Sequence, residues 1–218
     1  MLCVAISDIH CREVITPPAD LLLISGDITF RGSEPELNWF RQWLQRQPQR
    51  HKVWIAGNHE LGLEAEPGLA EAIAEETGSI YLEDSGTEIE GLKIWGSPVT
   101  PWFMDWAYNR RRGREIAGHW QKIPEGLDIL LSHGPPYGYL DTLMNGEKVG
   151  CADLLQTVQT SLNKPPRYLI CGHIHYSYGR KTLHRTDGQD IEIINASICD
   201  EEYVASNAPV VFRLPAAN

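Results

Sequence analysis

Short apolar segments recur along the chain, and most of them end in a cluster of polar residues. Five such segments, rich in Leu, Ile and Val, span residues 2–7, 20–27, 52–60, 127–136 and 167–175. Runs of this length and composition predict buried strands whose functional loops lie at their carboxyl ends. A further apolar run over residues 209–214 predicts a last strand.

Four segments between the strands have helical character, at residues 33–47, 67–78, 114–123 and 151–162. The first begins with Ser33, and Glu36 follows three residues later, which is a capping-box pattern. Its apolar residues recur at the spacing of one helical face and are expected to point to the core. The second segment has Pro67 in its expected first turn and Gly78 as its expected C-cap.

The elements alternate between strand and helix at first and become rich in strands toward the end. Hairpins are expected at residues 87–98, turning at Glu90-Gly91, and at residues 181–197, turning at Asp187-Gly188. We therefore predict an α/β fold in which two packed mixed β-sheets form a sandwich flanked by α-helices. The 218 residues contain no internal repeat and no low-complexity linker, so we expect one domain over residues 1–218.

The net charge limits which binding partners are expected, and the cysteine content indicates the cellular compartment. The formal net charge of −10 disfavours a long nucleic-acid footprint, although a local positive charge can still bind a small anion. The 5 cysteines are odd in number and form no CxxC pair, so we expect a reducing cytosol rather than a disulfide framework. We identify no signal peptide and no apolar run of the roughly 20 residues that a membrane span needs. A cytoplasmic protein without membrane contact is therefore expected.

Polar side chains of similar chemistry follow five of the predicted strands. Taken singly, each has an ordinary explanation, since an Asp before a turn often caps it and a lone His is usually hydrogen-bonded structure. Taken together, they gather carboxylate, amide and imidazole groups at the carboxyl ends of strands, which converge on one rim in sheet-based folds. The residues are Asp8, His10, Asp27, Asn58, His59, His133, His173 and His175.

This set of donors predicts a metal site. Oxygen and imidazole ligands without thiolate suit Mn, Fe, Zn or Co rather than Ca or a soft metal. The donors are too many for one tetrahedral ion and suit two ions that share a carboxylate and clamp a phosphoryl group. An extended backbone over residues 172–175 would place His173 and His175 on the same side, with Ile174 turned toward the core.

The order of these motifs resembles the calcineurin-like metallophosphoesterase superfamily. The motifs are Asp8-Ile-His10, Gly26-Asp27, Gly57-Asn58-His59-Glu60, His133 and Gly172-His173-Ile174-His175. The segments GLKIWGSPVTPWFMDWAYN, SHGPP, GHIH and NASIC look like the metallophosphodiesterase-domain branch, which is class III phosphodiesterase-like. The resemblance implies a four-layer αββα fold and a phosphodiesterase that acts on nucleotide-type or other small phosphodiesters, cyclic nucleotides among them.

The resemblance also implies a role for each motif residue. Asp8, His10 and His175 would bind a first metal ion, and Asn58, His133 and His173 a second. Asp27 would bridge the two ions, and His59 would protonate the leaving oxygen of the substrate. Glu60 is expected to order the loop rather than to act in catalysis.

The expected cofactors are two divalent or trivalent ions, with Mn the one expected to support activity in vitro. Two divalent ions and two carboxylates leave the site positive, so it would attract an anion despite the acidic chain. A hydroxide that bridges the ions would attack phosphorus, since metal-bound water loses its proton near neutral pH.

Three other interpretations remain open. A serine/threonine protein phosphatase or phosphomonoesterase of the same superfamily shares the earlier motifs, but it has Asp where Phe30 precedes Arg31 and usually lacks the paired GHxH. A nuclease is disfavoured by the negative charge. A non-catalytic scaffold with the same fold would normally have lost ligands, and none is missing here. The physiological substrate, native metals and oligomeric state remain open.

Two motif residues and several residues outside the motifs are candidates for further roles. Asn58, His59, Trp102 and Arg31 are the candidates for substrate contact. Trp102, Phe103 and Trp106 are expected in the core by default, with an aromatic wall for a nucleobase as the alternative. The arginines of Arg110–Arg114 are expected at a solvated helix start, and His51, His119 and His184 at the surface. Cys11 neighbours His10 without an assigned role.

Overall fold

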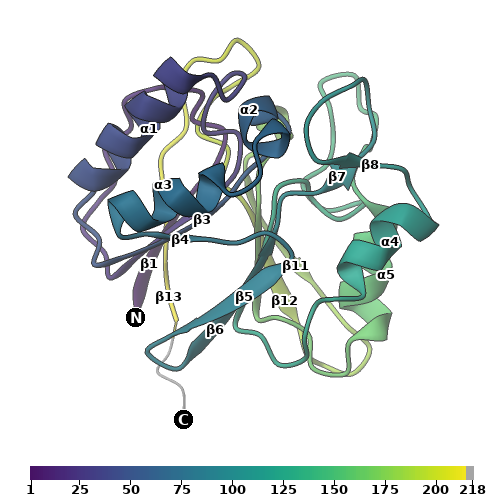
Figure 1. The fold of residues 1–218 in the computed structure, drawn as a ribbon. Helices are drawn as coiled ribbons and strands as arrows, with labels where there is room; N and C mark the ends of the chain where they lie inside the picture. Colours follow the sequence, from purple (N-terminus) through teal and green to yellow (C-terminus); the bar gives the residue numbers. More distant parts are fainter. Residues whose placement is uncertain (215–218) are drawn as a thin grey trace.

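Two β-sheets packed face to face form the centre of the computed structural model, which describes residues 1–214 (Figure 1). The first sheet has the strand order β13-β1-β2-β3-β4 and the second β11-β12-β10-β9-β6-β5. The strands of the first sheet are β13 (Val210–Arg213), β1 (Leu2–Ile6), β2 (Leu21–Ser25), β3 (His51–Ile55) and β4 (Ile80–Tyr81). Those of the second are β11 (Gly179–Leu183), β12 (Ile191–Asn195), β10 (Tyr168–Cys171), β9 (Ile129–Ser132), β6 (Leu92–Ser97) and β5 (Ser85–Ile89).

Most neighbouring strands run parallel, and this brings the motif loops to one edge. Strands β1 to β4 are parallel, and β13 adds antiparallel at the edge of the first sheet. In the second sheet β12, β10, β9 and β6 are parallel, with β11 and β5 antiparallel at its two edges. The loops that follow β1, β2, β3, β9 and β10 therefore gather at the carboxyl ends of both sheets.

The layers follow from the alternation of side chains along each strand. In β1, Val4 and Ile6 pack toward the helices, whereas Cys3 and Ala5 face the second sheet. One apolar cluster lies between the first sheet and helices α1 (Glu34–Arg46) and α3 (Leu69–Thr77), and a second lies between the sheets. A third fills the space between the second sheet and helices α4 (Arg114–Trp120) and α5 (Ala152–Gln156). The α/β fold predicted from the sequence, two packed sheets flanked by helices, is confirmed (Figure 1).

Several local predictions are confirmed. Helix α1 begins after Ser33, whose N–H donates to the Glu36 carboxylate at 2.8 Å as the capping box requires. Both hairpins form: β5 pairs with β6 across Glu90-Gly91, and β11 pairs with β12. Gly78 ends α3 in the left-handed conformation.

Three predicted helices have other boundaries, and one of them, α4, ends at Trp120 rather than at Ile123. Pro67 lies between the short helix α2 (Leu61–Ala65) and α3, because Gly68 has φ +87° and interrupts the helical backbone before α3 begins. The segment predicted as one helix over residues 151–162 begins as α5 and continues as a π-helix over Thr157–Ser161. A short parallel pair, β7 (Thr100–Pro101) and β8 (Asn109–Arg110), was not predicted and holds the two ends of the Trp102 loop together.

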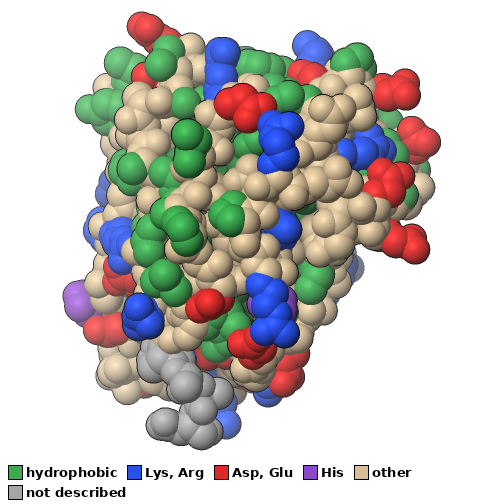
Figure 2. Space-filling view, turned by 90° about the vertical axis from the view of Figure 1, so that its left-hand side faces the viewer, with side chains coloured by type: hydrophobic (Ala, Val, Ile, Leu, Met, Phe, Trp, Pro, Cys, Tyr) green, Lys and Arg blue, Asp and Glu red, His purple; other side chains and the backbone are tan. Residues whose placement is uncertain are grey.

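The surface mixes charges of both signs. On the face shown in Figure 2, lysine and arginine side chains lie among aspartate and glutamate, and apolar side chains gather in small groups between them. Within residues 1–214, no helix has both the length and the apolar character needed to cross a membrane.

Candidate metal centre

The two sheets approach each other closely where the motif loops meet. The N–H of Ser7, after β1 of the first sheet, donates to the carbonyl of Ala196, after β12 of the second sheet, at 2.8 Å. A Cβ on Gly172 would overlap the Asp8 carboxylate and the Ser7 hydroxyl. Glycine is therefore required at this position for the loops of β1 and β10 to touch.

Three groups of titratable side chains lie together at this junction, each with its ligand atoms within 4.8 Å of one another. One group consists of Asp8, His10 and His175, and another consists of Asp27, His133 and His173. The remaining group, His10, Asp27 and His59, shares His10 with the one and Asp27 with the other. The structure thus brings together all the residues that the sequence predicted for two metal ions, with Asn58 Oδ1 2.9 Å from His133 Nε2.

Four of the histidines are held in the same way. Each has its Nδ1 at 2.8–3.0 Å from a main-chain carbonyl oxygen, which can only accept a hydrogen bond, so Nδ1 carries the proton. When the imidazole is neutral, the opposite nitrogen, Nε2, is therefore the one that offers a lone pair. This carbonyl-to-imidazole arrangement is typical of metal-ligating histidines. The pairs are His10 with Thr29, His59 with Phe30, His133 with Ser25, and His175 with Asp200.

The backbone of the centre is strained at several non-glycine residues. Asp8, His10, Asp27 and His173 have φ values of 52°, 41°, 51° and 67°, in the left-handed region. Such conformations cost energy in L-residues and persist where surrounding structure imposes them, often at functional sites. The tight loops aim these side chains inward.

The local geometry of the GHIH segment differs from the prediction. The backbone over residues 172–175 is not extended: His173 is left-handed, and a 3₁₀ turn begins at His175. His173 and His175 therefore do not lie on one side of an extended strand, contrary to the prediction. His173 nevertheless lies beside His133, with ring centroids 5.0 Å apart, and His175 lies beside His10 at 5.4 Å, so the turn directs the two imidazoles to different donor groups.

Glu60 organises the loops without facing the cavity. Its buried carboxylate accepts hydrogen bonds from the N–H groups of Asp27, Thr29 and Gly57 at 2.7–3.0 Å, and from the Thr29 hydroxyl at 2.9 Å. Burial and the nearby Asp27 charge raise the pKa of Glu60 to about 7. These contacts agree with the ordering role that the sequence predicted for Glu60.

Burial and mutual attraction shift the pKa values of the paired groups. Burial alone would raise the pKa values of Asp8 and Asp27, but the adjacent histidines outweigh it and lower them. Burial alone would lower the pKa values of His133 and His175, but Asp27 and Asp8 raise both to about 9. Burial and repulsion from His133 lower the pKa of His173 to about 3. In the protein without metal, protons on His133 and His175 therefore balance the two carboxylates.

These groups fit divalent metal ions. The Nε2 atom of His10 is buried and has no hydrogen-bond partner among the described residues, so a ligand would satisfy it. Carboxylate and imidazole donors converge without a thiolate, which is the donor set that Mn, Fe, Zn and Co prefer. His10, His133 and His175 would each offer Nε2, and Asp8 and Asp27 their carboxylate oxygens.

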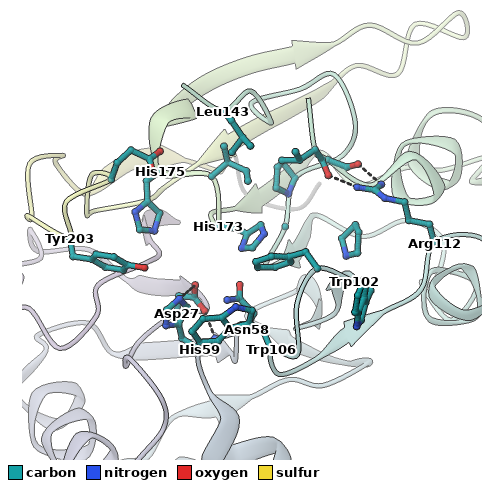
Figure 3. Close-up of a pocket in the computed structure, with 18 residues that line it drawn as sticks. Asp27, Asn58, His59, Trp102, Trp106, Arg112, Leu143, His173, His175 and Tyr203 are labelled. Atoms are coloured by element: carbon teal, nitrogen blue, oxygen red, sulfur yellow. Dashed lines mark hydrogen bonds and ion pairs between the residues drawn. The ribbon is translucent and has the colours of Figure 1, made fainter. Parts of the chain in front are cut away.

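A cavity of about 450 Å³ opens from this centre (Figure 3). Asp27, Asn58, His59, His173 and His175 line its floor, and aromatic and apolar side chains form the walls. The walls come from the loop that holds Trp102, Phe103 and Trp106 and from the segment between β9 and α5, which supplies Pro135, Leu143 and Val149.

The aromatic loop and the arginines differ from their default predictions. Trp102 is 56 % exposed and Phe103 is 37 % exposed, so they are cavity walls rather than core residues. The Asn109 side chain holds this loop by donating to the Phe103 carbonyl at 2.8 Å. Arg110 lies in β8 instead of at a helix start, and α4 begins only at Arg114. The Arg112 guanidinium lines the cavity and donates to the Val149 and Gly150 carbonyls at 2.6 and 2.7 Å.

Arg31 and His119 also lie elsewhere than the sequence suggested. Arg31 is not among the described residues that line the cavity; its guanidinium lies 5.8 Å from the Trp106 ring. His119 and His51, both predicted at the surface, are partly buried instead: His119 hydrogen-bonds to Asp84 at 2.6 Å, and His51 lies 3.3 Å from the Glu90 carboxylate. His184 is exposed, as predicted.

Sequence reasoning missed Tyr203, which lines the cavity beside His59 and His175. The strand β12 and the polar residues after it follow the same pattern as the five motif loops, with an apolar run that ends in a polar cluster. From the sequence, that segment is assigned to a hairpin and its NASIC stretch to the family resemblance, but no site residue is assigned to it. Applying the strand-end rule to it would have found the loop, although not the orientation of Tyr203.

Comparisons with known proteins assign the chain to a family. A family model described as calcineurin-like phosphoesterase matches residues 2–177. Metallophosphoesterase domain-containing protein 1 of Homo sapiens is 38% identical over 236 residues, which cover 97% of this chain and 70% of that protein. The UPF0046 protein T07D4.2 of Caenorhabditis elegans is 37% identical over 226 residues, covering 91% of this chain and 55% of that protein.

Solved structures share the fold. The crystal structure of TT1561 of Thermus thermophilus matches with a TM-score of 0.57 at 11% identity, over 89% of this chain and 88% of that one. At this identity the match shows the fold alone. Together with the family match over residues 2–177 and the human relative, the fold and the site lead to one conclusion: the chain belongs to the calcineurin-like phosphoesterase family.

Proposed function

We propose that the chain is a dinuclear metal-dependent phosphodiesterase that hydrolyses small phosphodiesters, nucleotide-type substrates among them. One observation carries the proposal: Asp27 belongs to two donor groups, one with His10 and one with His133 and His173, and in each group the ligand atoms lie within 4.8 Å of one another. A carboxylate in this position suits two ions that share it. We assign Asp8, His10 and His175 to one ion, and Asn58, His133 and His173 to the other.

The chemistry divides between the ions and the chain. When bound, two divalent cations supply the positive charge that holds a phosphoryl group and the acidity that activates water. The chain supplies the remaining contributions. Asp27 accepts the His59 N–H at 2.9 Å through Oδ1, which fixes the His59 backbone at the cavity floor.

His59 is oriented as a proton donor. Because its Nδ1 donates to the Phe30 carbonyl at 2.8 Å, its Nε2 is the atom available to the cavity, and it lies 3.9 Å from Asp27 Oδ2. Trp106 packs against the ring at 4.5 Å between centroids and limits its rotation. A protonated Nε2 in this position can donate to the departing alkoxide of a diester.

The size and lining of the cavity favour a small substrate with an organic substituent. The volume of about 450 Å³ lies in the range of small-molecule sites, and most of the wall is apolar or aromatic. Trp102 can offer a flat face to a nucleobase, since bases stack on aromatic rings. The net charge of −10 argues against a long nucleic-acid partner, and all 5 cysteines are free, which suits the cytosolic location that we propose.

Rates on a substrate panel test the proposal. With Mn²⁺, kcat/KM for a cyclic nucleotide and for bis(4-nitrophenyl) phosphate should exceed that for a phosphoserine peptide by at least about tenfold, because the aromatic and apolar walls suit a small organic substituent. Initial rates under identical metal conditions measure this. A higher kcat/KM for the peptide would favour the protein phosphatase alternative, and absence of turnover with two bound metals would favour a binding scaffold.

The variant Trp102→Ala tests whether Trp102 stacks on a nucleobase of the substrate. Loss of base stacking should raise KM for the cyclic nucleotide about tenfold and change KM for a simple aryl phosphate less. Equal effects on both substrates would count against stacking by Trp102.

Metal binding should compete with protons. Because the pKa values of His133 and His175 are raised to about 9 and a ligating imidazole must be neutral, loading at pH 7 should release protons. The apparent Mn²⁺ affinity should therefore rise from about pH 6 toward about pH 9 and level off above it. Calorimetric titration in two buffers of different ionisation enthalpy counts the protons released.

The number of metal ions bound per chain by Asp27→Ala, compared with the wild type, tests the shared carboxylate. Elemental analysis should find two metal ions per wild-type chain and fewer in this variant. Two ions retained by Asp27→Ala would contradict the shared carboxylate, and loading without proton release would contradict the assignment of His133 and His175 as ligands.

His59→Ala should separate acid catalysis from metal binding. We expect both ions to remain, and kcat for a diester with an alkoxide leaving group to fall by about 10²–10⁴-fold, since no proton reaches the leaving oxygen. The loss should be smaller for a 4-nitrophenolate leaving group, which needs no proton. His184→Ala, at an exposed histidine that pairs with Asp190, is the control and should match the wild type. A wild-type rate on the alkoxide substrate in His59→Ala would disprove the acid role.

A further inference from the structure

Tyr203 is placed at the metal centre by the loop between β12 and β13. Its ring lies edge-on to His10, with centroids 4.7 Å apart, and 5.6 Å from His175. Phe30 packs on it at 5.5 Å. Figure 3 shows the side chain reaching into the cavity from the side of His175, with its hydroxyl end toward the space above Asp27 and His59.

The loop is anchored so that this side chain keeps its direction. Arg12 Nε donates to the Tyr203 carbonyl at 2.9 Å, and the Tyr203 N–H donates to the Asp200 carbonyl at 2.9 Å. The Asp200 carboxylate accepts from the N–H groups of Glu202 and Val204 at 3.0 Å. The Asp200 carbonyl also accepts from His175 Nδ1, so one residue orients both the loop and a predicted metal ligand.

The backbone of Tyr203 is strained in a way that local sequence does not explain. Its φ of 59° lies in the left-handed region, which glycine or asparagine adopts at less cost than an aromatic residue. A turn of this shape needs no tyrosine. Strain at a residue that faces a cavity points to a use for its side chain.

The ring and the hydroxyl make separable contributions. The ring packs against His10 and Phe30, and phenylalanine would do this equally well. The hydroxyl is a neutral donor at physiological pH, and a donor aimed at a developing oxyanion stabilises it. The Tyr203 and His59 ring centroids are 6.2 Å apart and both side chains line the same cavity, so both face a phosphate group bound there.

We infer that Tyr203 contacts the substrate: its hydroxyl donates a hydrogen bond to a non-bridging oxygen of the phosphoryl group held at the metal centre. The inference rests on the proposed function, since it assigns one more contact to the same site. Tyr203 would hold the phosphoryl group from the side of His10 and His175, and His59 would serve the leaving oxygen.

The test uses Tyr203→Phe in the Mn²⁺-loaded full chain, with inorganic phosphate as the probe. Calorimetry should show phosphate bound at least about tenfold more weakly than by the wild type, since a hydrogen bond to a charged group is lost. The kcat/KM for the diester should fall by a similar factor, and the metal content should remain two ions per chain.

Tyr176→Phe is the matched control. Tyr176 is 60 % exposed and lies outside the residues that line the cavity, so this variant should bind phosphate like the wild type. Wild-type phosphate affinity and kcat/KM in Tyr203→Phe would overturn the inference, and so would loss of metal from that variant, which would show a structural role for the hydroxyl. If the wild type binds phosphate but hydrolyses no ester, the proposed function fails, and the phosphate affinity of Tyr203→Phe still decides the role of Tyr203.

Discussion

Two buried carboxylates determine how the site is built. Asp8 is 0 % exposed and Asp27 is 2 % exposed, and the burial of a carboxylate costs several kcal/mol unless partners compensate its charge. Asp8 accepts from the His173 N–H and the Ser197 hydroxyl, and Asp27 accepts from the His59 N–H. The histidines around the two carboxylates compensate the rest of their negative charge. In the protein without metal this requires protons on His133 and His175, and two cations would replace those protons with a larger positive charge.

The same constraint explains why the loops are so tight. To place donors from both sheets around two carboxylates, the loops of β1 and β10 must touch, and this is possible because residue 172 is glycine. The left-handed backbones of Asp8, Asp27 and His173 are part of that arrangement. Glu60 offsets some of this strain, since its carboxylate binds the N–H groups of three separate loop residues. The stability of the fold and the geometry of the site are therefore closely linked.

The layered arrangement of sheets and helices could be predicted from the sequence, and so could the residues that gather at the metal centre, because both follow from periodic patterns. Buried parallel strands appear as apolar runs, and their carboxyl ends share an edge, so the residues after them had to lie together. Geometry within the loops was not predictable in this way. The GHIH segment is expected to be extended, but the left-handed backbone of His173 turns the chain. The sequence of these four residues does not specify that turn.

The walls of the cavity were harder to predict than its floor. Trp102 and Phe103 look like core residues by composition, yet the pairing of β7 with β8 closes their loop outside the core and leaves both exposed. Arg112 is exposed, as expected of a solvated charge, but its position at the cavity edge depends on its hydrogen bonds to the carbonyls of Val149 and Gly150. These placements depend on contacts between segments far apart in the sequence, which local patterns do not encode.

The central claim is that one carboxylate, Asp27, joins two metal sites. The most direct measurement is an anomalous difference map from crystals grown with Mn²⁺, collected near the manganese absorption edge. The account predicts two peaks about 3.5–4 Å apart, one beside Asp8, His10 and His175 and the other beside His133 and His173, with Asp27 between them. A single peak, or two peaks without Asp27 between them, would contradict it.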